Sequence, residues 1–182
     1  MSGQVGNNWV PMAGVSALFV GGAVAGLIAG DNTGAVAAYF VVATLVLILL
    51  AAPWLVRNPP AINANSGTYL ILAVVLELAA LLGGSIAALR GLGGWLVLGA
   101  GLVAYGLLER GRVMVTAGAF AVLAGVVAVV AHQSWLTVSL QLLTAAVFAL
   151  AAGRLRQLLL SHRQVPDDAP ESPAPAFPGG SP

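Results

Sequence analysis

Residues 34–56 read GAVAAYFVVATLVLILLAAPWLV, and no charged side chain interrupts this run of 23 residues. An α-helix rises about 1.5 Å per residue, so about 20 consecutive apolar residues cross the hydrocarbon core of a bilayer. The run is therefore long enough and apolar enough to form a transmembrane helix. It indicates the fold class of the whole chain, because the flanking sequence is also made of long apolar runs with few charges.

The composition of the 182 residues supports this interpretation. Hydrophobic residues make up 59% of the chain and charged residues only 7%, and the mean hydropathy is +0.97. A soluble domain carries about a quarter charged residues. So few charges cannot cover a surface that faces water, which excludes a soluble enzyme, a nucleic-acid-binding protein and a disordered protein. We predict an all-α integral membrane protein.

Charged residues and turn residues divide the chain into six apolar segments. The expected spans are residues 9–30, 34–56, 68–89, 92–108, 113–131 and 134–153, with a basic helical extension of the last span to residue 160. The short connections after the first, third and fifth spans predict three helical hairpins. Residues 1–8 form a short N-terminal segment, and the six prolines of residues 161–182 predict a disordered tail.

The arginines predict the orientation of these spans, because cytoplasmic flanks are enriched in Lys and Arg. Six spans leave Arg90 alone on one side of the membrane. The other side holds the remaining six: Arg57, Arg110, Arg112, Arg154, Arg156 and Arg163. Both termini are therefore expected in the cytoplasm. The use of Arg without Lys, in a chain rich in Ala and Gly, favours a GC-rich bacterial genome and the bacterial cytoplasmic (inner) membrane.

Glu77 is the one ionisable residue deep within an expected span. A carboxyl group at that depth costs about 2 to 3 kcal/mol on insertion scales. Counted along the helices, Gln141, Thr144 and Thr44 lie at a similar level and form a candidate intramembrane polar cluster with it. Glu77 is either a proton-coupled or ion-coupled carboxyl group or a protonated side chain that joins helices by hydrogen bonds. The scarcity of other polar groups in the spans favours the second interpretation.

Catalytic and metal sites are not expected. A membrane enzyme needs at least two convergent polar groups, and the chain has no cysteine and only two histidines. His132 and His162 fall on opposite sides of the membrane, so they cannot share a metal or a haem. His132, in the turn after the fifth span, is a candidate pH-sensing residue because histidine changes charge near physiological pH. A solvated turn residue is the simpler interpretation.

Small residues recur every fourth position in three spans. In lipid, this spacing lets helix backbones approach closely. Packing within the bundle is the first interpretation, and homo-oligomerisation through one exposed ridge is the second. The ridges consist of Gly22, Gly26 and Gly30, then Gly83, Ala87 and Gly91, and finally Ala145, Ala149 and Gly153.

The last two spans carry a family resemblance. Residues 119–130 read AFAVLAGVVAVV and residues 140–156 read LQLLTAAVFALAAGRLR. Together they resemble the hairpin repeat of HdeD-type proteins, which are small six-span bacterial membrane proteins linked to acid resistance. The resemblance covers roughly residues 113–156, and it departs from that repeat because the outer turns here contain no proline. It implies a stress-related membrane protein and no catalytic residues.

These observations together predict a non-enzymatic multi-pass membrane protein without a cofactor. Its expected partners are the lipid bilayer and either a second copy or another membrane protein, through helix packing. Two alternatives remain open. The chain is a small proton-coupled transporter or channel that uses Glu77, or it is a small subunit of a larger membrane complex.

Overall fold

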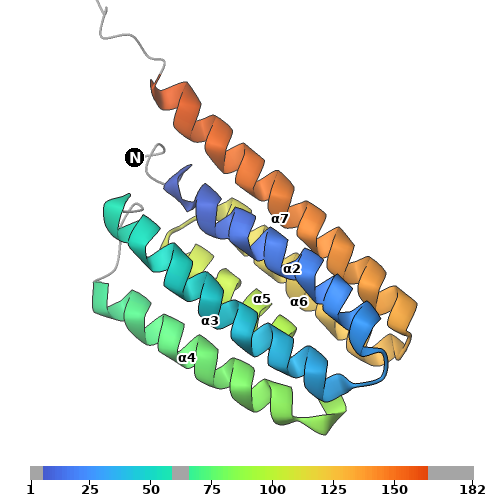
Figure 1. The fold of residues 1–182 in the computed structure, drawn as a ribbon. Helices are drawn as coiled ribbons and strands as arrows, with labels where there is room; N and C mark the ends of the chain where they lie inside the picture. The colour runs from blue at the N-terminus through green and yellow to red at the C-terminus, as the bar shows by residue number, and fades with distance from the viewer. Residues whose placement is uncertain (1–5, 59–65, 164–182) are drawn as a thin grey trace, which may run out of the picture.

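The computed structural model describes residues 6–58 and 66–163 of the chain. All secondary structure in these residues is helical (Figure 1), as predicted. The α-helices are α2 (Trp9–Ala29), α3 (Thr33–Arg57), α4 (Ser66–Ser85), α5 (Gly93–Leu108), α6 (Arg112–Ala131) and α7 (Ser134–Arg163), and the short 3-10 helices are η1 (Gly6–Asn8) and η2 (Ala87–Leu89).

The lengths of these helices suit a membrane. In the described part of the chain, five helices are long enough and apolar enough to cross a bilayer, namely α2, α3, α4, α6 and α7. The remaining helix, α5, is apolar but has only 16 residues. Length and composition therefore support the prediction of an integral membrane protein.

The six α-helices pack in sequence order, and α7 returns to pack against α2 (Figure 1). Each helix is antiparallel to the next along the chain. α5 contacts α3, α4 and α6 and is largely buried, including Trp95 and Leu98. At about 1.5 Å per residue, α5 spans about 24 Å, less than the roughly 30 Å hydrocarbon core. Its neighbours shield it, so its short length leaves little backbone against lipid.

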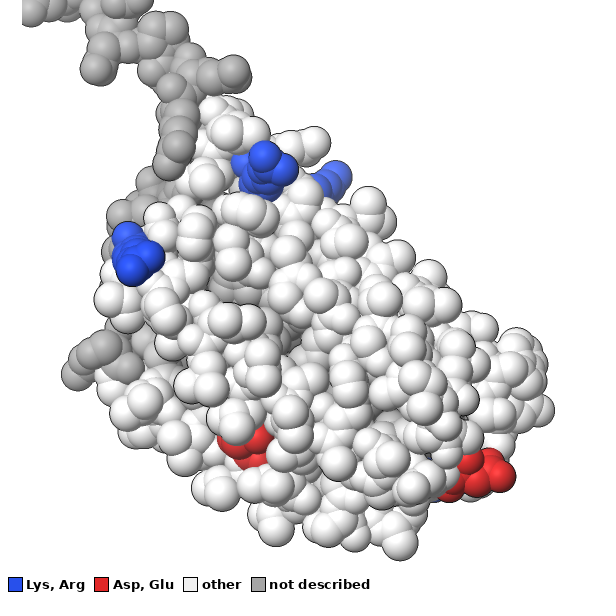
Figure 2. All heavy atoms as spheres, viewed as in Figure 1, with Lys and Arg blue, Asp and Glu red and all other residues white. Residues whose placement is uncertain are grey.

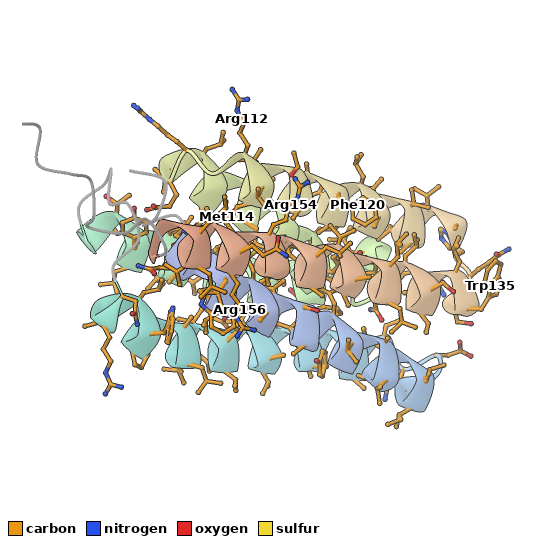
Figure 3. The ribbon with its side chains drawn as sticks, turned by 90° about the horizontal axis from the view of Figure 1, so that it is seen from above. Arg112, Met114, Phe120, Trp135, Arg154 and Arg156 are labelled. Carbon is orange, nitrogen blue, oxygen red and sulfur yellow. The ribbon has the colours of Figure 1, made fainter. Side chains whose placement is uncertain are left out.

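The bundle has two distinct ends. The turn end contains the connections at residues 30–32, 86–92 and 132–133, and the arginine end contains the start of α2, the end of α3 and the α5–α6 connection. On the face shown in Figure 2, the blue arginine side chains gather toward the chain termini, and a broad uncharged surface separates them from the red acidic side chains. Figure 3 shows Arg112 projecting away from the bundle at the arginine end and Trp135 at the opposite end.

Aromatic contacts hold the arginine end together. The guanidinium carbon of Arg156 lies 5.6 Å from the ring centroid of Trp9, and the Trp9 ring meets Trp54 edge to face at 5.9 Å. The Trp54 indole donates a 2.9 Å hydrogen bond to the Asn7 carbonyl. These contacts join α7, α2 and α3, and the exposed Arg156 side chain lies against Trp9 (Figure 3).

The centre of the bundle is filled by aromatic rings. Phe19 of α2 stacks on Phe148 of α7 with centroids 5.7 Å apart, and it meets Trp95 of α5 edge to face at 5.5 Å. Phe40 of α3 completes the cluster at 6.1 Å from Phe19. All four side chains are fully buried. We call these four residues the aromatic cluster, and it closes the space between the helices at mid-depth.

The end of α4 differs from the expected span of residues 68–89. The helix ends at Ser85, where the hydroxyl group bonds to the carbonyls of Leu81 and Leu82, and η2 follows. Gly83 also packs directly on Gly93, where a Cβ atom would lie 2.1 Å from the Gly83 carbonyl oxygen. This close approach brings α4 and α5 together, and the chain turns there.

The C-terminal end of the last helix also differs from the prediction. α7 continues past residue 160 to Arg163, while residues 164–182 of the expected tail lie outside the described residues.

The contact between α5 and α6 is formed around glycines that do not belong to the three ridges of small residues. Gly99 and Gly106 are seven residues apart on α5, as are Gly118 and Gly125 on α6. A Cβ atom on Gly118 would lie 2.8 Å from the Val103 backbone nitrogen. Seven-residue spacing keeps small residues on one face of a helix over two turns, so this signal is present in the sequence.

The three ridges of small residues take different positions. Gly22 and Gly26 face Gln141 of α7, Gly83 faces Gly93, and Ala145 is buried with its carbonyl accepting a hydrogen bond from Ser16. The remaining members lie in turns or on the surface: Gly30, Ala87, Gly91, Ala149 and Gly153.

Candidate functional site

The four polar residues expected at mid-depth do not hydrogen-bond to one another. The Thr44 and Thr144 hydroxyl groups each donate a 2.7 Å bond to a carbonyl of their own helix, at Phe40 and Leu140. The Gln141 amide has no hydrogen-bond partner among the described residues. Glu77 lies on α4, which packs mainly against α3 and α5, whereas Gln141 lies on α7, which packs mainly against α2 and α6.

Glu77 lies at the edge of the buried face of α4. Its side chain is half-buried, next to the exposed Leu78 and one turn before the buried Ala80. Its Oε2 atom is covered by protein and, among the described residues, has no hydrogen-bond partner. The bundle therefore covers one oxygen of this carboxyl group without satisfying it.

Gln141 lies at the base of a cavity that opens at the turn end. The cavity has a volume of about 120 Å³ and is lined by residues of α2, α3, α6 and α7 and of the η2–α5 connection. Among the lining residues are Asp31, Arg90, His132, Thr137 and Gln141. We call this cavity the turn-end pocket. It brings together two candidates, Gln141 and His132, that the sequence analysis did not connect.

The amide of Gln141 is buried without a partner. The residue is 1% exposed, and neither its Oε1 nor its Nε2 has a hydrogen-bond partner among the described residues. A Cβ atom on Gly22 would lie 3.6 Å from Nε2, and one on Gly26 would lie 3.9 Å from Oε1. Because both positions are glycine, no side chain covers the amide from α2. Leaving such a group unpaired costs about 1 to 3 kcal/mol.

Two residues at the rim of the pocket are held by tight turns. Arg90 and His132 both adopt left-handed backbone conformations, with φ of 50° and 57°, which non-glycine residues seldom adopt. Gly91 has φ of 79°, and a Cβ atom there would lie 2.2 Å from the Thr33 carbonyl oxygen. Only glycine fits this contact, which presses the turn against the start of α3 and so positions Arg90.

His132 ends α6 as its C-cap residue. Its side chain is exposed, and its Nδ1 lies 2.6 Å from the Val130 carbonyl oxygen. The expected pH-sensing residue is thus accessible to water at the rim of the turn-end pocket.

A second group of buried polar residues lies at the arginine end, and the sequence analysis missed it. Glu109, the C-cap residue of α5, is 1% exposed and accepts a hydrogen bond at Oε1 from the Tyr69 hydroxyl group. Its Oε2 has no partner among the described residues. Burial raises the pKa of the Glu109 carboxyl group above its ordinary value, and the Tyr69 hydrogen bond opposes this shift.

Two further side chains extend this group toward the start of α2. The Tyr105 hydroxyl group donates a 2.7 Å hydrogen bond to Oδ1 of Asn8, which is fully buried. The rings of Tyr69 and Tyr105 meet edge to face at 5.9 Å. We call Asn8, Tyr69, Tyr105 and Glu109 the arginine-end cluster. It ties the N-terminal segment, α4 and α5 together.

The sequence signal for this cluster is topological. Each of its residues falls at the same end of an expected span, so alternating helices bring them to one end of the bundle. Glu109 is followed closely by Arg110 and Arg112. A carboxyl group next to arginines in a connection between helices is typical of a solvent-exposed charge. Its burial depends on Tyr69, which is 40 residues away in the chain.

The two groups of buried polar residues lie at opposite ends of the bundle. The aromatic cluster separates the turn-end pocket from the arginine-end cluster, and the Trp95 indole nitrogen within it also has no partner among the described residues. In the part of the chain that the structure describes, no three His, Asp or Glu side chains lie close enough to hold a metal ion.

Comparisons with protein-family models, with curated proteins and with solved structures find no match to this chain. The resemblance to HdeD-type proteins therefore stays a prediction from residues 113–156.

Proposed function

We propose that this chain is a non-enzymatic, stress-related or accessory protein of the bacterial cytoplasmic membrane that acts by packing α4 against a second copy or another membrane protein. In this proposal all six α-helices cross the bilayer and both termini are cytoplasmic. The distribution of arginines supports the orientation. Arg57, Arg110, Arg112 and Arg156 lie at the arginine end and Arg90 lies at the turn end.

The observation that carries the proposal is the unsatisfied carboxyl group of Glu77 on the most exposed helix. Only 11% of the apolar window of α4 is buried, against 39% for α6. Leu78 and Leu82, which both follow Glu77 on α4, are 55% and 69% exposed. A carboxyl group at this depth costs about 2 to 3 kcal/mol in lipid. The bundle covers Oε2, so a neighbouring chain that donates a hydrogen bond to the other oxygen, Oε1, reduces this cost.

A cross-linking experiment tests the proposal directly, because the chain contains no cysteine. A single cysteine replaces Leu78 on α4, and the matched control replaces Leu123 on α6. Leu123 is 66% exposed, and it lies at a similar depth because each leucine is 11 or 12 residues from the arginine-end start of its helix. Oxidation in native membranes is expected to form a disulfide between two Leu78→Cys chains, or between Leu78→Cys and a cysteine of one stoichiometric partner, and to leave Leu123→Cys monomeric.

Equal cross-linking at the two positions, or none at either, contradicts the proposal. A cross-link to several proteins of a stable assembly favours the subunit of a larger complex. Adding Glu77→Leu to the Leu78→Cys chain is expected to weaken the cross-link, since the carboxyl group no longer needs a partner.

A proton-coupled transporter is the second candidate, and the turn-end pocket favours it. The pocket reaches from the turn end to Gln141, and the buried Glu109 lies beyond the aromatic cluster. Transport would require the aromatic cluster to move. Flux driven by a pH gradient into proteoliposomes, compared between the wild type, Glu77→Gln and Glu109→Gln, tests this candidate, because the two variants separate a route at α4 from one that starts at the turn-end pocket. Flux that either substitution abolishes supports it, and the absence of flux in all three proteins refutes it.

A further inference from the structure

We infer that the turn-end pocket binds a small zwitterion of the size of glycine or alanine, with its ammonium group near Asp31, its carboxylate near Arg90 and a hydrogen bond to the Gln141 amide. This inference goes beyond the proposed function, since it concerns the turn end of the bundle and is independent of the α4 surface.

The size of the pocket limits the ligand. On a comparable measure one water molecule needs about 10 to 15 Å³, and pockets for drug-sized ligands occupy about 300 to 1,000 Å³. The turn-end pocket, at about 120 Å³, lies between these values. It accommodates a molecule of a few heavy atoms or several water molecules, and it excludes nucleotides and sugars.

The base of the pocket favours a polar occupant. Gln141 is 1% exposed, yet its amide oxygen and nitrogen have no partner among the described residues. An amide group presents two donors and one acceptor. Protein covers both amide atoms, so an occupant bonds to them only after the Gln141 side chain turns toward the pocket. A polar occupant would satisfy the amide after this rotation, and an apolar one would not.

The rim supplies two opposite charges. Asp31 and Arg90 both line the pocket, and neither has an ion-pair partner within the described residues. A small anion would be repelled by Asp31 and a small cation by Arg90. A zwitterion satisfies both, because its two charges are separated by a short distance. A guanidinium group is also well suited to bind a carboxylate through two parallel hydrogen bonds.

The glycines of α2 keep the pocket open. Gly26 lines it, and a Cβ atom there would lie 3.9 Å from Gln141 Oε1 and 3.9 Å from Val138. These are ordinary contact distances, so alanine fits the fold at this position while it fills space beside the amide. Gly26→Ala is therefore a variant that blocks the ligand without disturbing helix packing.

Cysteine protection tests the inference. One cysteine replaces Thr137, which lines the pocket, and the control cysteine replaces Ala88, an exposed residue of η2 at the same end. The rate of modification by a small water-soluble thiol reagent is measured on the full chain in nanodiscs. Each modification rate is measured without added solute and then in the presence of glycine, acetate, methylammonium or acetamide.

We expect glycine to slow modification of Thr137→Cys several-fold and to leave Ala88→Cys unchanged. Acetate, methylammonium and acetamide are expected to protect much less, because each lacks at least one charge. The protection by glycine is expected to disappear when Gly26→Ala, Arg90→Gln or Asp31→Asn is added.

Three results overturn the inference. Modification of Ala88→Cys but not Thr137→Cys shows that the pocket is closed to water. Equal rates with and without glycine show that it binds no zwitterion of this size. Equal protection by all four solutes shows that the pocket admits any small polar molecule. The charges of Asp31 and Arg90 then do not discriminate between a zwitterion and the other solutes.

Discussion

The two ends of the bundle treat buried polar groups differently. At the arginine end, the buried Glu109 and Asn8 each accept one hydrogen bond from a tyrosine, although Glu109 Oε2 and Asn8 Nδ2 have no partner among the described residues. At the turn end, the buried Gln141 amide has no partner at either atom, and the side chain lines the turn-end pocket. Hydrogen bonds between buried side chains stabilise one fold. A wholly unpaired amide beside a pocket gains hydrogen bonds if it turns toward a ligand.

The largest expected effect is at the arginine end. Tyr69→Phe removes the hydroxyl group that satisfies Glu109 Oε1 and leaves the buried carboxyl group without this donor. We expect the free energy of unfolding to fall by about 1 to 3 kcal/mol, measured by chemical denaturation in detergent micelles. The control Thr116→Val removes a hydroxyl group that bonds only to carbonyls of its own helix on an exposed surface. A loss for Tyr69→Phe no larger than that for the control would show that the cluster does not stabilise the fold.

The pH dependence of stability follows from the same carboxyl group. Because burial raises the pKa of Glu109 in the folded state, the folded protein binds more protons than the unfolded protein between the two pKa values. Stability is therefore highest at low pH and falls as the pH rises from the unfolded value through the folded value. Glu109→Gln is expected to remove this decline and to be more stable than the wild type at neutral pH. Unfolding midpoints measured across this pH range check the sign, and an unchanged decline in the variant would contradict it.

The turn end is expected to respond in the opposite direction. Gln141→Leu replaces a buried, unpaired amide by an apolar group of similar size. We expect the free energy of unfolding to stay the same or to rise by up to about 1 kcal/mol, because the desolvation cost of the amide disappears. The same measurement on Thr144→Val, one turn away in a fully paired site, provides the comparison. A clear loss of stability in Gln141→Leu would mean that the amide is needed for folding, and that the two ends are alike.

The helices could be predicted from the sequence because the bilayer imposes their length. An apolar run of about 20 residues bounded by charges has few alternatives in a membrane. The six expected segments accordingly fall within a few residues of the observed helices, except that α4 ends early. That end depends on the contact of Gly83 with Gly93, and a contact between two helices is not encoded in the hydropathy of either.

The sites were harder to predict, for a related reason. Counting residues along a span gives the depth of a side chain but not the direction in which it points. Gln141 was grouped with Glu77 by depth, yet α7 and α4 are not neighbours in the bundle, and Gln141 faces Gly22 and Gly26 instead. Glu109 was not expected to be buried because it is followed by Arg110 and Arg112 in the sequence. Only the order of helices around the bundle shows that Tyr69 reaches it.

A further effect is expected at the rim of the turn-end pocket. His132 has φ of 57°, a conformation that glycine adopts freely and that alanine adopts at a cost. His132→Ala is expected to lower the free energy of unfolding by about 1 kcal/mol. His132→Gly is expected to change this free energy by only a few tenths of a kcal/mol. Thermal unfolding of the two variants measures the difference. If the two are equally stable, the turn at His132 relaxes when the ring is lost. The rim of the turn-end pocket is then held by Gly91 and Arg90 alone, and His132→Ala should still allow glycine to protect a cysteine at Thr137.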